Sequence, residues 1–169
     1  MDIVRTVYRE DHEMLRATAR RFFEKECLPH QAEWDAAGRT PREIWRKAGR
    51  EGILCQMIPA EYGGGGGDFG HAMIVHEEWM RAGVSGFATG MHSDIIAPYI
   101  VRLGTDEQKR RWLPGICAGE TILAIGMTEP GGGSDLKALR TTAVRDGDHY
   151  VINGSKTFIS SGLNCDLLI

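Results

Sequence analysis

A short segment rich in glycine and hydroxyl groups lies in the C-terminal part of the chain and has the composition of a ligand-binding turn. It is Thr128–Asp135, which has the sequence TEPGGGSD and directly follows a short apolar run. Glycine permits close approach of the backbone and positive φ angles, so successive N–H groups can converge on an anion or a carbonyl oxygen. Taken alone, the segment also fits an ordinary surface turn, and both interpretations stay open at this point.

A second segment of similar character follows at Asn153–Gly162, with the sequence NGSKTFISSG. On residue type alone, its Phe158 and Ile159 are two strand residues that face a core. The glycine run Gly63–Gly67 is different, because neither Lys-Ser nor Lys-Thr follows it and no strand is predicted before it. We therefore exclude a phosphate-binding loop there. We predict a flexible connection between two helices, which acts as a mobile surface loop or permits a close backbone contact.

Few side chains have the spacing of a metal site or of acid–base catalysis. His71, His76 and His92 show no metal-ligand spacing, so we predict surface or packing positions for them and no metal site. Glu129 lies in a turn beside a proline, which indicates a structural role. The four cysteines include no Cys-x-x-Cys pair, which favours free, buried thiols.

The composition excludes several classes of protein. The 169 residues carry 20 basic and 23 acidic side chains, a net charge of −3, which lacks the basic surplus of a nucleic-acid-binding protein. No apolar run approaches the roughly 18 residues of a membrane span, and the first residues show no targeting segment. A hydrophobic share of 42% and a charged share of 25% are typical of a globular protein. The length fits one domain, or one domain and part of another.

Residues 10–120 have the periodicity and capping signals of helices. Asp11 is the predicted N-cap of the first helix, which Pro29 ends. The capping box Thr40–Glu43 opens the next helix, and Gly52 stops it. Later helices are predicted over 69–82 with Gly83 as the stop, over roughly 87–103 ending at Gly104, and from a capping box at Thr105 to Pro114.

After Gly119 the pattern changes to short strands separated by turns. The predicted strands are Thr121–Met127, a hairpin of Thr141–Val144 and His149–Ile152 with Asp-Gly in its turn, Lys156–Ser160, and the beginning of a strand at Asp166–Ile169. The sequence therefore predicts a helical domain over residues 1–120 and the start of a β-sheet domain over residues 121–169.

Together, the two glycine-containing segments resemble the signatures of the acyl-CoA dehydrogenase family. Met127–Leu136 is similar to the first signature, and Asn153–Gly162 is similar to the second at the expected distance. The helical part is similar as well, at Trp34, Glu43–Trp45 and Tyr62–Gly64. The resemblance implies an α+β fold, with an N-terminal all-helical domain followed by an incomplete antiparallel β domain. It places the family's C-terminal helical bundle outside this chain.

The resemblance also implies a bound FAD and an activity in fatty-acid β-oxidation. Family members oxidise acyl-CoA thioesters to 2,3-enoyl-CoA by removal of an α-proton and transfer of a β-hydride to flavin N5. The stretches Ala124–Thr128 and Phe158–Ser160 are most similar to the long-chain branch. The residues that the resemblance places at the cofactor are Ile125, Gly126, Met127, Thr128, Gly133, Ser134, Phe158, Ile159 and Ser160, and it also places Ser134 at the substrate.

Several of these residues have implied roles on the ring and the phosphates. Ile125, Met127 and Thr128 would lie along the isoalloxazine ring, with backbone groups and the Thr128 hydroxyl on its pyrimidine edge. Such hydrogen bonds favour the negative charge of a reduced flavin. Gly133 and Ser134 would approach the pyrophosphate and the CoA side of the cleft.

Phe158 and Ser160 have implied roles at the reacting part of the flavin. Phe158 would pack on the flavin face opposite the substrate, and the Ser160 hydroxyl would lie near N5. Many family members carry tryptophan and threonine at these two positions. Phenylalanine keeps the stacking face but loses the indole N–H, and serine keeps the hydroxyl, so neither change argues against FAD.

No residue of this chain is assigned as the catalytic base. The family's base is a glutamate of the C-terminal helical domain, beyond Ile169, so we expect a portion of a longer protein and no dehydrogenase activity from these 169 residues alone. The resemblance implies an acyl-CoA substrate, an electron-transfer flavoprotein as electron acceptor, and a full-length homo-oligomer (dimer or tetramer). It implies a bacterial cytoplasmic or mitochondrial matrix location.

Two alternatives to a dehydrogenase stay open. One is a non-catalytic homologue that binds flavin or acyl-CoA but lacks the base. The other is a related flavin oxidase or monooxygenase component.

Overall fold

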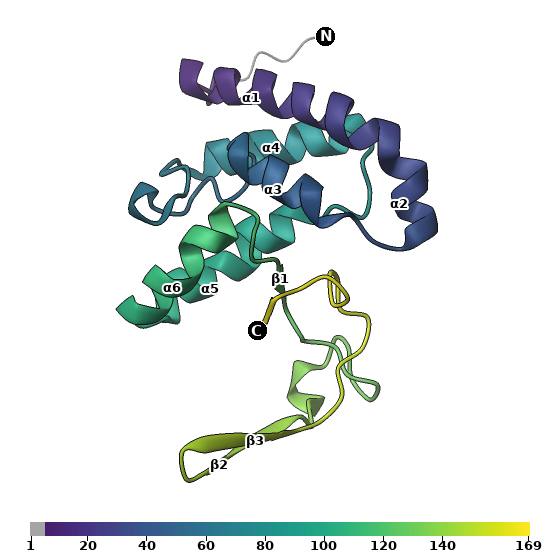
Figure 1. The fold of residues 1–169 in the computed structure, drawn as a ribbon, viewed down its shortest axis with the longest axis vertical. Helices are drawn as coiled ribbons and strands as arrows, with labels where there is room; N and C mark the ends of the chain where they lie inside the picture. The colour runs from purple at the N-terminus through teal and green to yellow at the C-terminus, as the bar shows by residue number, and fades with distance from the viewer. Residues whose placement is uncertain (1–5) are drawn as a thin grey trace.

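The computed structural model describes residues 6–169, which form a block of helices from which a small β part extends (Figure 1). The α-helices are α1 (Glu10–Phe22), α2 (Gln31–Ala37), α3 (Arg42–Arg50), α4 (Phe69–Ala82), α5 (Ala97–Leu103) and α6 (Asp106–Cys117). The shorter helical turns are η1 (Phe23–Cys27), η2 (Leu28–His30), η3 (Ala60–Tyr62), η4 (Met91–Ile96) and η5 (Leu136–Ala138). The strands are β1 (Leu123–Ala124), β2 (Thr142–Asp146), β3 (His149–Asn153) and β4 (Leu167–Leu168). Within the described residues, no helix is long and apolar enough to cross a membrane.

Capping signals locate α4 and the start of α6 correctly. The Asp68 carboxylate caps α4, and Gly83 ends it with a φ of +68°, a conformation that favours glycine. The Thr105 hydroxyl accepts a backbone N–H at the start of α6, as its capping box predicts. The predicted helix over 87–103 forms η4, a π-helical segment, followed by α5.

Both predicted boundaries of the first helix are wrong. Its N-cap is Arg9 rather than Asp11, because the ring Nδ1 of His12 accepts the Arg9 N–H at 3.0 Å. Pro29 does not end the helical path, since it lies in the first turn of η2, where its missing N–H is one of the donors that a helix start leaves without an intrahelical partner. The chain therefore bends through η1 and η2 into α2.

The capping box at Thr40 and the proline at position 114 both act differently from the prediction. Thr40 does not cap α3, whose N-cap is Pro41, and its hydroxyl accepts the indole N–H of Trp45 at 3.0 Å instead. The last helix also continues past Pro114, where it was predicted to end. Proline removes only its own backbone donor, and the Pro114 carbonyl still accepts the Ala118 N–H at 3.0 Å.

A continuous apolar core fills the helical block. Its largest fully buried side chains include Phe22, Phe23, Trp45 and Phe87. The rings of Trp45 and Phe87 meet edge to face with 4.7 Å between their centroids. Burying one such ring stabilises the fold by about 2–3 kcal/mol.

The glycine run Gly63–Gly67 makes the close backbone contact that was one of its two predicted roles. A Cβ on Gly64 would lie only 2.2 Å from the carbonyl oxygen of Ile58. The Gly65 N–H donates to the carbonyl of Cys55 at 3.0 Å. The run is therefore a compact, hydrogen-bonded connection between η3 and α4.

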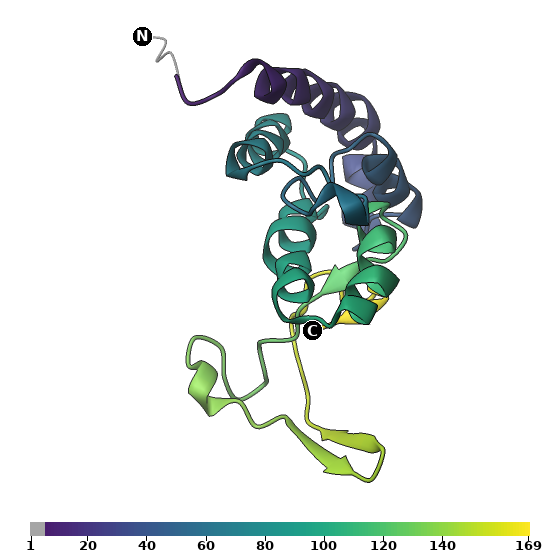
Figure 2. The same ribbon diagram turned by 90° about the vertical axis from the view of Figure 1, so that its left-hand side faces the viewer.

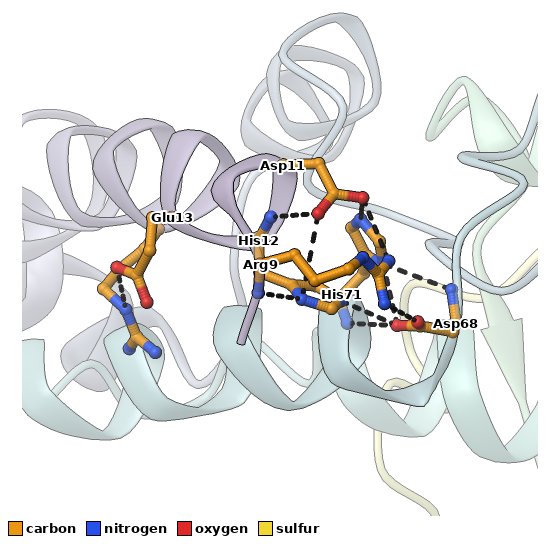
Figure 3. A network of polar contacts seen from close by, with 7 residues as sticks. Arg9, Asp11, His12, Glu13, Asp68 and His71 are labelled. Carbon is orange, nitrogen blue, oxygen red and sulfur yellow. Dashed lines mark hydrogen bonds and ion pairs between the residues drawn. The ribbon is translucent and has the colours of Figure 1, made fainter. Parts of the chain in front are cut away.

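Charged side chains join the N-terminal ends of α1 and α4 (Figure 3). The Asp68 carboxylate lies 2.8 Å from the His12 ring, 2.9 Å from the His71 ring and 2.9 Å from the Arg9 guanidinium. Asp11, His12 and His71 offer ligand atoms within 4.8 Å of one another. Arg9 is bonded to both aspartates and already supplies positive charge there, so this cluster acts as a cap for two helices.

The β part consists of two separate strand pairs. β2 and β3 form the predicted antiparallel hairpin, with Thr142 opposite Asn153. The hairpin projects away from the helical block in both views, and the residues of both strands are exposed (Figure 2). β1 and β4 pair in parallel, with Leu123 opposite Leu167. This parallel pairing was not predicted, because the sequence pattern gave a strand direction only for the hairpin.

His92 connects η4 to β1 inside the core, which confirms a packing position. Its side chain is almost completely buried, its Nδ1 accepts the Leu123 N–H at 3.2 Å, and its Nε2 donates to the Ile116 carbonyl at 3.1 Å. This pair of bonds requires the neutral ring, and burial lowers the pKa of His92 to about 4.

Acid should destabilise the fold through His92. As the pH falls from 6.5 to about 4, the unfolded chain binds a proton that the buried ring does not, which lowers the free energy of unfolding by about 3 kcal/mol. Urea unfolding at several pH values measures this, and His92→Gln should show a flatter pH dependence than the wild type. His30→Gln, at an exposed histidine, is the control. Equal slopes for wild type and His92→Gln would contradict this role.

Candidate functional site

β1 and β4 bring the two glycine-containing segments to one place. Their ladder extends beyond the strands, since the Gly126 N–H donates to the Ile169 carbonyl at 2.7 Å and the Ile169 N–H donates to the Ala124 carbonyl at 3.0 Å. β1 leads into Thr128–Asp135, and β4 follows Asn153–Gly162. The pairing therefore positions segments that are far apart in the sequence beside each other.

Hydrogen bonds join the two segments directly. The Thr157 N–H donates to the Thr128 carbonyl at 3.0 Å, and the Lys156 ammonium donates to the Met127 carbonyl at 3.3 Å. Two of the predicted cofactor residues, Met127 and Thr128, thus lie beside the residues that immediately precede Phe158. A site shared by both segments requires this adjacency.

Glu129 holds this junction together. Its carboxylate accepts the Arg140 N–H at 2.7 Å, the Thr141 N–H at 3.0 Å and the Lys156 ammonium at 2.9 Å, and its side chain is buried. Hydrogen bonding from Thr141, Arg140 and Lys156 lowers the pKa of Glu129 to about 2. The predicted structural role of Glu129 is confirmed. Lys156 was not predicted as a site residue, although its place in the second segment was a visible signal.

The predicted strand over Lys156–Ser160 is not formed. Phe158 and Ser161 have φ angles of +55° and +61°, and the Gly162 N–H donates to the Ile159 carbonyl at 3.0 Å in a turn. Phe158 is 91% exposed, so the core-facing interpretation from its residue type is wrong. This backbone conformation costs an ordinary residue about 1–2 kcal/mol. Such strain clusters at functional sites.

The other predicted site residues lie along this junction or on the turn that follows it. Ile125 and Gly126 are partly buried next to β4, whereas Ser160 is exposed. Gly133 and Ser134 are exposed on the turn after Glu129. In the described part of the chain, no hydrogen bond connects residues 130–135 to residues 156–160.

The junction exposes apolar side chains together with hydroxyl groups. Met127, Phe158 and Leu168 present apolar side chains that are 41%, 91% and 54% exposed. Among residues 6–169, the hydroxyls of Thr128 and Ser160 have no hydrogen-bond partner. Apolar side chains can cover the faces of an aromatic ring while hydroxyl and backbone groups bind its edge. The residues present therefore fit an isoalloxazine ring.

Arg42 anchors this β pair to the helices. From the sequence it was predicted only as part of the capping box Thr40–Glu43. Its guanidinium donates to the carbonyls of Asn164 and Glu120 at 3.1 and 2.8 Å, and to the Asp166 carboxylate at 2.7 Å. Asp166 accepts the Ile122 N–H at 2.8 Å. Burial would raise the pKa of Asp166, but the hydrogen bonds from Arg42 and Ile122 hold it below its ordinary value. No local pattern relates residues 124 positions apart, so the sequence contains no signal for this contact.

Comparison with known proteins is consistent with this geometry. The sequence profile described as "Acyl-CoA dehydrogenase, N-terminal domain" matches residues 9–120, and the profile described as "Acyl-CoA dehydrogenase, middle domain" matches residues 124–169. The chain belongs to the acyl-CoA dehydrogenase family. The resemblance inferred from the two segments is therefore confirmed, together with the α+β class and its helical N-terminal domain.

Individual family members match nearly all of this chain. The mitochondrial long-chain specific acyl-CoA dehydrogenase of Sus scrofa is 44% identical over 166 residues, which cover 98% of this chain and 39% of that protein. A crystal structure of an acyl-CoA dehydrogenase from Geobacillus kaustophilus is 46% identical, with a TM-score of 0.93 over 98% of this chain and 44% of that chain. An acyl-CoA dehydrogenase from Bacillus anthracis, solved as a complex with FAD, is 34% identical, with a TM-score of 0.86 over 99% of this chain and 29% of that chain.

These matches also show the extent of the chain relative to the family. It spans about two fifths of the length of the curated long-chain relatives that it matches.

Glu129→Gln should loosen the junction, because it removes the charge that binds Lys156. Amide hydrogen exchange at Arg140 and Thr141, whose N–H groups bind Glu129, should become several-fold faster. A carboxylate with a lowered pKa stabilises above pH 4.5, and this contribution is lost as the pH falls to about 2. Wild type and variant should therefore converge over that range.

The control for this prediction is Glu120→Gln, a change at an exposed carboxylate. Unchanged exchange at Arg140 and Thr141 in Glu129→Gln would contradict the role of Glu129.

Proposed function

We propose that this chain provides the N-terminal and flavin-facing parts of an FAD-dependent acyl-CoA dehydrogenase. The whole protein would oxidise acyl-CoA thioesters to 2,3-enoyl-CoA in fatty-acid degradation. The observation that carries the proposal is the 3.0 Å hydrogen bond between the Thr157 N–H and the Thr128 carbonyl, which joins both family signatures at one surface. Long-chain acyl groups are the proposed substrate class, supported by the 44% identity to the long-chain relative of Sus scrofa. Residues 1–120 and 121–169 are the proposed helical and β domains.

The proposed cofactor site uses the junction between the two signatures. The flavin, when bound, supplies a two-electron acceptor for the β-hydride of the thioester. Met127 and Thr128 would bind the polar edge of the ring through backbone groups and a hydroxyl, and Ile125 would line it. Donors at that edge stabilise negative charge on the reduced ring. Phe158 would cover one face, and the Ser160 hydroxyl would lie beside the ring.

Gly133 and Ser134 have a proposed role at the phosphates and at the substrate. Both are exposed, and a Cβ on Gly133 would meet nothing within 4 Å, so the turn leaves room for a bulky ligand. In the part of the chain that the structure describes, the Ser134 hydroxyl has no hydrogen-bond partner. Backbone N–H groups of this turn would bind the pyrophosphate oxygens, and the Ser134 hydroxyl would bind on the CoA side.

The proposed α-proton base lies beyond Ile169. Glu129 is unsuitable, because three donors hold its carboxylate and keep its pKa near 2. An electron-transfer flavoprotein is the proposed electron acceptor, and a homo-oligomer is the proposed assembly. The bacterial cytoplasm or mitochondrial matrix is the proposed location.

Phe158→Ala should weaken FAD binding without weakening the fold. The Phe158 ring is 91% exposed, so its removal should change the free energy of unfolding by less than about 0.5 kcal/mol. If the ring stacks on the flavin, its loss should cost about 2 kcal/mol of binding, roughly thirty-fold in Kd. Fluorescence titration with FAD measures this in protein expressed from the complete reading frame. Tyr150→Ala, at an exposed aromatic residue of the hairpin, is the control, and equal affinities for all three proteins would contradict the site.

Anaerobic mixing with a saturated long-chain acyl-CoA tests the activity. The visible flavin absorbance of the protein from the complete reading frame should bleach, and residues 1–169 alone should produce no enoyl-CoA. A flavin that is bound but never bleaches would support a non-catalytic binding protein instead. Rapid peroxide formation during turnover in air would indicate an oxidase.

A further inference from the structure

The Lys156 side chain connects the second signature to two different groups of the first. Its ammonium donates to the Glu129 carboxylate at 2.9 Å and to the Met127 carbonyl at 3.3 Å. Its stem lies over Gly126, where a Cβ would be 3.4 Å from the Lys156 Cγ. The Lys156 side chain is 23% exposed, so it is held along the junction of the two signatures and does not extend into water.

Glu129 fixes the position of this ammonium. Its side chain is 6% exposed, and its carboxylate also accepts the backbone N–H groups of Arg140 and Thr141. A carboxylate that two backbone donors hold cannot turn freely, so the ammonium that binds it is held in one place as well. The ion pair accounts for one of the three donors of the ammonium. The bond from a second donor to the Met127 carbonyl needs a separate explanation.

The Met127 carbonyl belongs to the same peptide group as the Thr128 N–H. This peptide is trans and planar, so its carbonyl and its N–H point in opposite directions. Because the Lys156 ammonium holds the carbonyl, the Thr128 N–H points away from Lys156. Among residues 6–169, this N–H has no hydrogen-bond partner, so it is available to a ligand.

The N–H groups on either side differ from that of Thr128. The Gly126 N–H is bonded to the Ile169 carbonyl, and the Glu129 N–H is bonded within the turn that follows it. Between them, the N–H groups of Met127 and Thr128 have no partner in the part of the chain that the structure describes. The two residues proposed to bind the polar edge of the flavin are therefore the two whose backbone donors the fold leaves free.

We propose that Lys156 is a positioning residue of the flavin site, an inference that rests on the proposed function. Through the Met127 carbonyl, its ammonium directs the Thr128 N–H toward the polar edge of the ring. Hydrogen bonds in a chain polarise one another, so a cation at the carbonyl makes the N–H of the same peptide a stronger donor. A donor at that edge stabilises the negative charge of the reduced ring more than the neutral oxidised ring. Lys156 therefore favours the reduced flavin without touching it.

The test compares the binding of oxidised and reduced FAD to protein expressed from the complete reading frame. Lys156→Met removes the ammonium but keeps an unbranched stem, and Glu129 keeps its two backbone donors. Relative to oxidised FAD, reduced FAD should bind about tenfold more weakly to this variant than to the wild type. For a two-electron couple, a tenfold change lowers the midpoint potential of the bound flavin by about 30 mV. Anaerobic titration against a reference dye measures this potential.

Lys109→Met is the matched control, because Lys109 is also paired with a carboxylate, that of Asp106, but lies on α6. It should leave the midpoint potential unchanged. Lys156→Arg keeps a cation with several donors and should give a potential close to that of the wild type. If Lys156→Met does not fold, Lys156→Gln, which keeps a polar but neutral side chain, provides the same comparison and should also lower the potential.

A purely structural role of Lys156 predicts equal losses of affinity for oxidised and reduced FAD. An unchanged midpoint potential in folded, flavin-bound Lys156→Met would therefore overturn this inference and leave the proposed function intact. An equal fall in potential in Lys109→Met would overturn the inference as well. A folded wild type that binds no FAD would overturn the proposed function, and this inference with it.

Discussion

The arrangement of this protein depends on satisfying the backbone hydrogen bonds of a buried strand. β1 is completely buried in the helical block, where an unpaired N–H or carbonyl would cost about as much as a lost hydrogen bond. Its polar groups and those of its neighbours are bound by Asp166, by His92 and by the parallel partner strand β4. Because β4 comes from the end of the chain, this requirement brings the C-terminal residues back to the helices and so places both family signatures together.

The same contacts connect the helical core to the junction of the two signatures. Arg42 at the start of α3 binds the β pair through Asp166, and His92 binds it from η4. The strand pair is therefore positioned by side chains from two different parts of the helical block. Beyond it, Glu129 fixes where the chain leaves the core. A short strand pair of this kind has little stability alone, so its geometry depends on these side chains.

The densely packed helical block and the exposed β part of this chain suit different roles. The helical block is densely packed around rings such as Trp45, whereas Phe158 and the β2–β3 hairpin are exposed. Exposed apolar side chains beside free hydroxyls suit ligand binding, and an unpacked hairpin suits contact with further protein. Two residues, Cys55 and Phe158, combine a left-handed backbone with a chemically distinctive side chain, one inside the core and one at its surface.

The sequence by itself determined α4, the start of α6 and the antiparallel hairpin, because periodicity, caps and turn residues act locally. The two signatures identified the family by resemblance, and the fold class followed from that resemblance and from the change of pattern after Gly119. The sequence also identified Glu129 as structural from its turn context. The tertiary structure alone decided the parallel β1–β4 pairing, the Arg42–Asp166 contact and the exposure of Phe158. The first two join residues more than forty positions apart, so no local pattern encodes them. The third depends on a positive φ angle that residue type alone argues against.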